Sequence, residues 1–400
     1  MNRIRTVITG MGIVSPIGCS VSEFWNNLIE GKYGIRPITV FDPAGFPYKQ
    51  AGEVIDFQPE INAGIEPVDR GLAFILEAVR QALVDAKLYP ETSTIIPAGI
   101  MLSTNFGSAI AMENVLKGTA SSHDFLKSGF QYSADIVARI FKLSGPRIVQ
   151  SLSCSGGTSA IGLAAGLIRS GRVDIAIAGG YDELSTFAWS GLSALRTMTT
   201  DKIKPFDKNR AGTIFSEGAG ALVIENIEHA RKRHVRCYAE VAGYAMNNNA
   251  FHLTAPPRDG TGSARVMQEA LLDAGLSPDS VDHINAHGTG TRDNDVTETR
   301  AIKTVFGEYA SKIPVTSNKS IIGHMMGAAG TAEAIASVLT IKNGIIPPTI
   351  NYETPDPECD LDYVPNVKRK ASIKVVLSNS AGIGGCNAAI VLRTIEETNE

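Results

Sequence analysis

The sequence predicts an α/β protein with a largely parallel sheet. Of its 400 residues, 44% are hydrophobic and 20% are charged, a composition that suits a large buried interior. Short β-branched runs alternate with stretches of helical periodicity along the chain, and strands interleaved with helices are typical of α/β architecture. Because the length exceeds what one hydrophobic core usually organises, we expect two domains or two fused halves.

The individual elements follow from the spacing of apolar residues. Continuous apolar runs, without alternation, predict strands that are buried on both faces. Such runs occupy residues 6–9, 98–102, 173–178 and 220–225. Apolar residues recur at helical spacing over residues 74–87 and 264–274, which predicts two amphipathic helices.

A pattern that occurs twice indicates an internal duplication. Residues 151–171 run from a polar turn into a helix rich in alanine and glycine, and residues 315–344 repeat this arrangement. Side chains that are small on nearly every face predict helices buried between layers, where backbones approach closely. We therefore expect two similar halves, 1–232 and 233–400, that meet in a charged segment. Two unrelated buried helices are the alternative.

Composition and charge exclude several classes of protein. Lys and Arg number 37 against 41 Asp and Glu, a net charge of −4, which is too balanced for a nucleic-acid-binding surface. The longest uncharged run, between Arg147 and Arg169, is rich in serine and glycine and could not span a bilayer. Polar residues and glycines also interrupt the apolar stretch after Arg5, so we expect a first strand there and not a secretion signal. These features predict a soluble, cytoplasmic protein with no nucleic-acid or membrane partner.

The cysteines do not form a recognisable disulfide or zinc pattern. Their number is odd and no two lie close together: Cys19, Cys154, Cys237, Cys359 and Cys386. This spacing favours a reducing compartment, and we expect no structural metal. Gly10 and Gly12 resemble the start of a dinucleotide fingerprint, but the third glycine is missing and no Walker motif exists, so the sequence does not favour NAD or ATP.

Cys154 is the first candidate catalytic residue. It lies in the turn directly before the first Ala/Gly helix and is followed by Gly156 and Gly157. Backbone N–H groups and the positive end of a helix lower the pKa of a thiol, so we expect Cys154 to favour the thiolate. The two glycines would let a substrate carbonyl approach the backbone. A buried structural cysteine is the alternative interpretation.

Two histidines occupy similarly unusual positions. His287 follows an apparent strand and opens a loop of glycine and threonine, a position where α/β proteins collect functional residues. His324 lies at the start of the second Ala/Gly helix. Either histidine alone could be a core residue, but together with Cys154 they predict a catalytic site.

These residues belong to a set of motifs that covers nearly the whole chain. Besides the Cys154 turn, the motifs are VITGMGIVSPIG (7–18), KPFDKNRAG with SEGAG (204–220), FHLTAP (251–256), NAHGTGT with ND and E (285–298), NKSIIGHMMGAAG (318–330), IIPPTIN (345–351) and SNSAGIGGCN (378–387). In this order they resemble the β-ketoacyl-acyl-carrier-protein synthases of the synthase II type (type II ketosynthases), members of the thiolase superfamily.

The resemblance implies a five-layered αβαβα fold built from two duplicated halves, usually assembled as a homodimer. It implies an acyltransferase that performs decarboxylative Claisen condensation of an acyl-cysteine intermediate with malonyl-acyl carrier protein, giving 3-oxoacyl-carrier protein in fatty-acid or polyketide elongation. The partners would be an acyl carrier protein and a second subunit, identical or ketosynthase-like. Beyond the phosphopantetheine arm of the carrier protein, no metal or cofactor would be needed.

The resemblance also assigns roles to residues. Cys154 would carry the acyl group, while His287 and His324 would assist loss of CO₂ and hold the enolate oxygen. Lys319, Asp295 and Glu298 would support the site. Contacts to the substrate or its pantetheine arm would come from Thr289, Thr291, Ile383, Ala381 and Thr213. The backbone N–H groups of Cys154 and Ile383 would form the oxyanion hole.

The chain departs from the family pattern where a gate of aromatic residues is usual. Ala381 and Ile383 stand in the closing loop where two phenylalanines are common, and Thr213 replaces a third. Lost rings widen the passage between the acyl pocket and the active site. We therefore expect an unusual acyl chain that is polyketide-like, polyene or otherwise bulky.

Three alternatives stay open at this point. The chain could be the ketosynthase subunit of a specialised polyketide or polyene system, paired with a chain-length partner. It could itself be a non-catalytic partner subunit, although such subunits lack the nucleophilic cysteine. It could also be a degradative thiolase, which uses a second cysteine as a base, and Cys386 invites that comparison.

Overall fold

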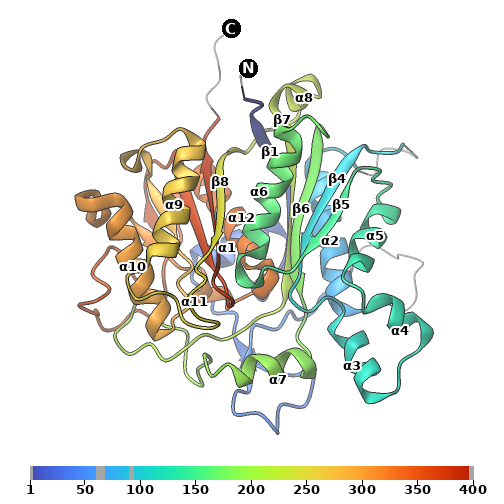
Figure 1. Ribbon diagram of the computed structural model, residues 1–400, viewed down its shortest axis with the longest axis horizontal. Coiled ribbons are helices and arrows are strands. Elements are labelled where there is room, and N and C mark those ends of the chain that lie inside the picture. The colour runs from blue at the N-terminus through green and yellow to red at the C-terminus, as the bar shows by residue number, and fades with distance from the viewer. Residues whose placement is uncertain (1–2, 60–67, 90–93, 396–400) are drawn as a thin grey trace.

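The computed structural model describes residues 3–59, 68–89 and 94–395. Within these residues a 10-stranded sheet runs in the order β10-β9-β13-β14-β8-β1-β7-β6-β4-β5 (Figure 1). Its strands are β1 (Thr6–Val14), β4 (Ala98–Ser103), β5 (Arg147–Gln150), β6 (Ile175–Asp182), β7 (Gly218–Asn226), β8 (Ala239–Asn248), β9 (His283–Asn285), β10 (Val315–Thr316), β13 (Val375–Ala381) and β14 (Cys386–Arg393). Two short ladders pair β2 (Arg36–Pro37) with β3 (Gln50–Ala51) and β11 (Ile345–Ile346) with β12 (Arg369–Lys370).

Helices fill the segments between these strands. They are α1 (Val21–Ile29), α2 (Arg70–Asp85), α3 (Ala109–Lys117), α4 (Ser122–Lys127), α5 (Gln131–Ile140), α6 (Gly156–Arg169), α7 (Thr186–Ala194), α8 (Ile227–Lys232), α9 (Thr261–Ala274), α10 (Arg292–Phe306), α11 (Lys319–Ile322) and α12 (Ala329–Asn343). Single 3₁₀ turns, η1 (Ser153–Ser155) and η4 (Met326–Ala328), precede α6 and α12. In the described part of the chain, no helix is both long and apolar enough to cross a membrane.

The sheet consists of two halves with the same topology. One half has the order β1-β7-β6-β4-β5 and the other has the order β8-β14-β13-β9-β10. In both halves the outer three strands are parallel and the inner pairs are antiparallel. The halves join through a short antiparallel pairing of β1 with β8. The predicted α/β class with duplicated halves is confirmed. The boundary after residue 232, which falls between α8 and β8, stays a prediction.

The expectation of a largely parallel sheet is wrong. The pairings β1–β7, β1–β8, β6–β7, β13–β14 and β14–β8 are all antiparallel. The clearest cause is the short connection between β13 and β14, residues 382–385, because a short turn joins only antiparallel neighbours. The alternation of strands and helices along the sequence does not reveal that neighbouring strands pair in antiparallel orientation.

The two Ala/Gly helices form the central layer. Helix α6 packs against β4 and β6 of the first half and against β8 and β14 of the second, and α12 packs against β7 and β13. On the outer faces, α2 covers β1 and β7 while α9 covers β8 and β14, which completes the αβαβα layers (Figure 1). A Cβ atom at Gly157 would lie 2.8 Å from the backbone nitrogen of Thr331, so the small residues allow the close approach that their pattern predicted. This contact brings the N-terminal ends of α6 and α12 together.

Candidate active site

Cys154 lies in a tight turn between β5 and α6. Ser153, directly before it, has a φ of 49°, a left-handed conformation that is uncommon for serine. The turn places Cys154 in η1, against the start of α6, where the residue is 7% exposed. The loop after β13 closes over it, because a Cβ atom at Gly382 would lie 3.2 Å from the Cys154 nitrogen.

The protonation state of Cys154 differs from the sequence prediction. Burial raises the pKa of its thiol to about 11, while the charge of Lys319 and a hydrogen bond from the Ile383 backbone lower it by less. The prediction that the start of the helix favours the thiolate is therefore wrong for this chain in its free state. Burial disfavours a charged sulfur more strongly than nearby donors favour it, so the resting form is the thiol.

His287 is held from both sides of its backbone. Its N–H and that of Gly288 donate to the Glu298 carboxylate at 2.7 and 2.8 Å. The Lys319 ammonium donates to the His287 carbonyl at 2.6 Å and lies 3.4 Å from its Nδ1. Because the ammonium has only donors, Nδ1 accepts and Nε2 carries the ring proton. Lys319 is itself paired with Glu333, whose carboxyl pKa burial raises to about 7.

His324 presents the same ring nitrogen to the same space. The backbone N–H of Met326 donates to its Nδ1 at 3.1 Å, so Nε2 again carries the proton. Nε2 is buried and has no hydrogen-bond partner among the described residues. The His287 and His324 ring centroids are 5.5 Å apart, with an interplanar angle of 83°.

Both imidazoles are neutral. Burial holds the pKa of His287 and of His324 well below the ordinary value, and the charge of Lys319 lowers each further. A neutral ring with its N–H directed into a cavity can donate a hydrogen bond without delivering a full proton. The pair can therefore stabilise a negatively charged oxygen and leave an adjacent carbanion unprotonated.

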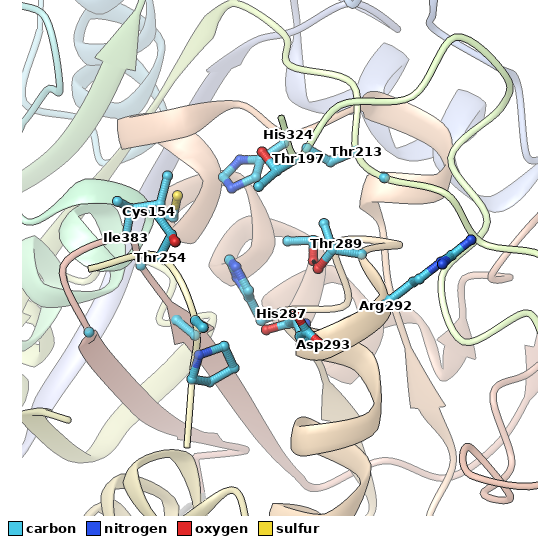
Figure 2. Close-up of a pocket in the computed structure, with 18 of the residues that line it drawn as sticks. Cys154, Thr197, Thr213, Thr254, His287, Thr289, Arg292, Asp293, His324 and Ile383 are labelled. Atoms are coloured by element: carbon cyan, nitrogen blue, oxygen red, sulfur yellow. Dashed lines mark hydrogen bonds between the residues drawn. The ribbon is translucent and has the colours of Figure 1, made fainter. Parts of the chain in front are cut away.

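One cavity of about 390 Å³ collects the predicted residues. Its lining includes Cys154, His287, His324, Thr213, Thr289, Thr291, Ala381 and Ile383 (Figure 2). Figure 2 shows Cys154 with Ile383 on one side of the space and His324 with Thr213 on another. The structure thus brings together side chains from both halves of the chain.

The predicted supporting residues lie behind this lining. Lys319, Asp295 and Glu298 are buried and do not line the cavity themselves. Asp295 accepts hydrogen bonds from the backbone of Phe206 at 2.7 Å and of Gly290 at 3.2 Å, and burial raises its carboxyl pKa to about 6. These groups fix the loop that carries His287 and the two threonines.

Sequence reasoning missed several residues of the site. Glu333, the partner of Lys319, was signalled only by being an acidic residue inside an Ala-rich helix. Phe215 lines the cavity and its ring centroid is 5.3 Å from that of His324. Phe215 lies two positions after Thr213. Its ring therefore supplies part of the aromatic surface that is absent at residue 213. Other lining residues not singled out include Arg196, Thr197 and Asn249.

The pH dependence of alkylation tests the state of Cys154. With a thiol pKa of about 11, the thiolate fraction rises about tenfold per pH unit below that value. We expect the rate of iodoacetamide modification at Cys154 to climb in this way from pH 7 to pH 10, measured by peptide mass spectrometry. The Cys154→Ala variant is the control, because the alkylated Cys154 peptide should be absent from its mass spectrum. A rate that levels off near neutral pH would contradict the burial argument and restore the thiolate expected from the helix.

Comparisons with known proteins agree with this geometry. The β-ketoacyl synthase N-terminal domain model matches residues 4–230 and the C-terminal domain model matches residues 238–353. The 3-oxoacyl-[acyl-carrier-protein] synthase 2 of Coxiella burnetii is 39% identical, covering 99% of this chain and 100% of the relative. The enzyme of the same name from Synechocystis is 38% identical, with 98% and 99% covered.

Two solved structures are similarly close. A type II polyketide synthase acyl carrier protein in complex with its ketosynthase bound to the hexaketide (AntDE:AntF) contains a chain of 37% identity and TM-score 0.90. The ishigamide ketosynthase/chain length factor contains one of 36% identity and TM-score 0.91. Each match covers 98% of this chain and 100% of the other.

Proposed function

The chain belongs to the β-ketoacyl synthase family, and we propose that Cys154, His287 and His324 carry out its reaction. The protein is an acyltransferase that performs decarboxylative condensation of an acyl group with malonyl-acyl carrier protein, which gives a 3-oxoacyl-carrier protein. The observation that carries the residue assignment is the shared cavity, whose wall includes a cysteine and two neutral imidazoles.

The first step transfers the acyl group. The Cys154 sulfur attacks the thioester carbonyl of the acyl-carrier protein, and the backbone N–H groups of Cys154 and Ile383 stabilise the tetrahedral oxyanion. The bond to the pantetheine sulfur then breaks. In the sum of the step, the thiol proton passes from Cys154 to the departing pantetheine thiol. The Ile383 backbone lies close enough to the Cys154 sulfur to lower the pKa of its thiol, which supports this placement of the oxyanion hole.

The second step forms the carbon–carbon bond. Malonyl-carrier protein places its thioester oxygen between the Nε2–H groups of His287 and His324, and the bond to its carboxylate breaks to release CO₂. The electron pair forms an enolate, whose oxygen the two N–H groups stabilise. Its α-carbon attacks the acyl carbonyl on Cys154, and the Cys154 thiolate leaves and takes a proton from solvent. Lys319, paired with Glu333, holds His287 in the required tautomer.

The proposed function is tested by detecting both the acyl-enzyme intermediate and the condensation product. Wild-type protein incubated with an acyl-carrier protein should show an acyl adduct on the Cys154 peptide by mass spectrometry. Addition of carboxyl-labelled malonyl-carrier protein should then release labelled CO₂ and a 3-oxoacyl product in equal amounts. Cleavage of a 3-oxoacyl thioester that depends on coenzyme A, without CO₂ release from malonyl-carrier protein, would instead support a degradative thiolase.

We also propose how partners meet this site. Thr289 and Thr291, whose hydroxyls lie 2.8 Å apart at the cavity wall, would contact the phosphopantetheine arm of an acyl carrier protein in the cytoplasm. Related structures hold a ketosynthase with its carrier protein and a ketosynthase with a chain length factor. By analogy, the chain would act as a homodimer or beside a ketosynthase-like subunit. The steps above use side chains and the carrier arm, and call for no further cofactor.

The missing rings of the gate support a bulky or oxidised acyl substrate. Ala381, Ile383 and Thr213 all line the cavity, so their small or branched side chains leave it wider than aromatic rings would. Ile383 lies beside Cys154, and Thr213 lies on the His324 side (Figure 2). The variant Ala381→Phe/Ile383→Phe should reduce the rate of condensation with a polyene or oxidised primer by about tenfold or more, since a tight steric fit is worth about 1–3 kcal/mol. A short saturated primer should be affected less.

Competition assays with both primers measure this difference. The control is Ala381→Val/Ile383→Val, which adds branched bulk without rings and should leave the preference near that of wild type. Wild-type protein that uses straight saturated chains fully and oxidised chains not at all would contradict the proposal.

A further inference from the structure

Thr213 holds a buried hydroxyl with no hydrogen-bond partner. It lies in an extended segment where its N–H donates to the Thr197 carbonyl at 2.9 Å and its carbonyl accepts from Thr199 at 3.0 Å. The residue is 2% exposed, and its Oγ1 has no hydrogen-bond partner among the described residues. A buried hydroxyl left without a partner is destabilising. Because Thr213 lines the substrate cavity, a bound substrate is a candidate partner for this hydroxyl.

The segment also fixes where this hydroxyl lies. The backbone N–H of His324 donates to the carbonyl of Ile214, the next residue, at 2.8 Å. Thr213 and His324 both line the cavity, and Figure 2 shows Thr213 beside His324 and Thr197 and away from Cys154. Nε2 of His324 is the other buried side-chain atom of this cavity wall that has no partner in the described part of the chain. Thr213 and His324 thus each contribute an unpartnered polar atom to the wall of the same cavity.

The chemistry of the malonyl group matches this arrangement. Its thioester oxygen must lie at the two Nε2–H groups, and its α-carbon must face the acyl group on Cys154. The carboxylate is the remaining substituent, and it must stand out of the plane of the forming enolate. Phe215 and Thr213 line the His324 side of the cavity, where this substituent would lie. A growing acyl chain, in contrast, starts from Cys154 on the other side.

We propose that the Thr213 hydroxyl donates a hydrogen bond to the carboxylate of the malonyl group and positions it for loss of CO₂. The proposal rests on the proposed function and assigns Thr213 as a residue that binds the extender unit. A hydrogen bond to a carboxylate is stronger than one to a neutral group. It is lost as the carboxylate becomes neutral CO₂, so it stabilises the bound substrate more than the transition state.

Because the hydrogen bond stabilises the bound substrate more than the transition state, its loss should change KM and kcat differently. In Thr213→Val, which has nearly the same shape without the hydroxyl, the KM for malonyl-carrier protein should rise by roughly tenfold or more. The kcat for CO₂ release should stay the same or increase, because the bound state that loses the hydrogen bond is the ground state. Thr213→Ser keeps the hydroxyl and should show a KM near that of wild type.

The experiment measures release of labelled CO₂ from carboxyl-labelled malonyl-carrier protein for wild type, Thr213→Val and Thr213→Ser. Acylation of Cys154 by an acyl-carrier protein is measured in parallel, without malonyl substrate, and should change much less than the KM for malonyl-carrier protein. An unchanged KM in Thr213→Val would overturn the proposal. So would a joint fall of kcat and of the acylation rate, because that pattern indicates disturbed packing or a contact to the acyl chain. If the proposed function itself fails, the wild-type protein releases no CO₂, which separates the two outcomes.

Discussion

Replacing Cys154 by alanine is expected to abolish condensation while malonyl decarboxylation persists. The side chain provides the only atom that holds the acyl group in the proposed mechanism, and loss of a covalent nucleophile lowers the rate by up to the order of 10⁶-fold. Loss of CO₂ depends instead on the two imidazoles, whose contacts to Met326 and Lys319 do not involve the thiol. The measurement is formation of 3-oxoacyl product and release of labelled CO₂, assayed separately with the same protein.

Cys386→Ala is the matched control for this variant. Cys386 lies at the start of β14, where its sulfur accepts a hydrogen bond from the Asn248 amide at 3.4 Å, and it does not line the cavity. The Cys386→Ala variant should therefore catalyse condensation at a rate within a few-fold of that of wild type. Loss of activity in Cys386→Ala comparable to that in Cys154→Ala would contradict the condensing mechanism, because a second catalytic cysteine is the feature of degradative thiolases.

Replacing His324 by alanine is expected to slow decarboxylation by about 10²–10³-fold, the usual effect of losing one oxyanion donor. The Nε2–H of His324 is one of the two groups that would stabilise the enolate oxygen, and no other described side chain pairs with it. Acylation of Cys154 should change much less, since its oxyanion is assigned to backbone N–H groups. Stopped-flow acylation and CO₂ release, measured on the same variant, separate the two steps.

The pH profile provides a second check on the same residue. Because the pKa of both histidines is held well below the ordinary value, both rings stay neutral as the pH falls from 8 to 6. The rate of decarboxylation should show no histidine titration in that interval. The Glu333 carboxyl, whose pKa is raised to about 7, titrates in the same interval. A fall with an apparent pKa near 6.5 that persists in Glu333→Gln would therefore contradict the neutral pair. Equal losses of acylation and decarboxylation in His324→Ala would contradict its assigned step.

Much of the site was predictable because its chemistry is encoded locally. Cys154 before an Ala/Gly helix, His287 after a strand and His324 before the second such helix are short-range patterns, and the structure places all three in one cavity. The repeated Ala/Gly helix likewise predicted the duplication, because small side chains on every face suit only a buried layer. Local spacing determines local backbone geometry, and local geometry was enough for these conclusions.

Other features depended on contacts between distant segments. The antiparallel returns within each half of the sheet arise from how β1, β8 and the β13–β14 turn meet, not from any one segment. The Lys319–Glu333 pair and the unpartnered Thr213 hydroxyl likewise became visible only when their surroundings were assembled. Burial and pairing are properties of the packed molecule, so no pattern within a short window reports them.

Short patterns along the chain predicted Cys154, His287 and His324 as the reacting residues and two similar halves that enclose them. Their charge states, in contrast, follow from packing. Cys154 rests as a thiol and His287 and His324 as neutral rings, because burial disfavours charge on each of them. The free energy of an ion depends on the medium that surrounds it, and that medium exists only once both halves have packed around the cavity.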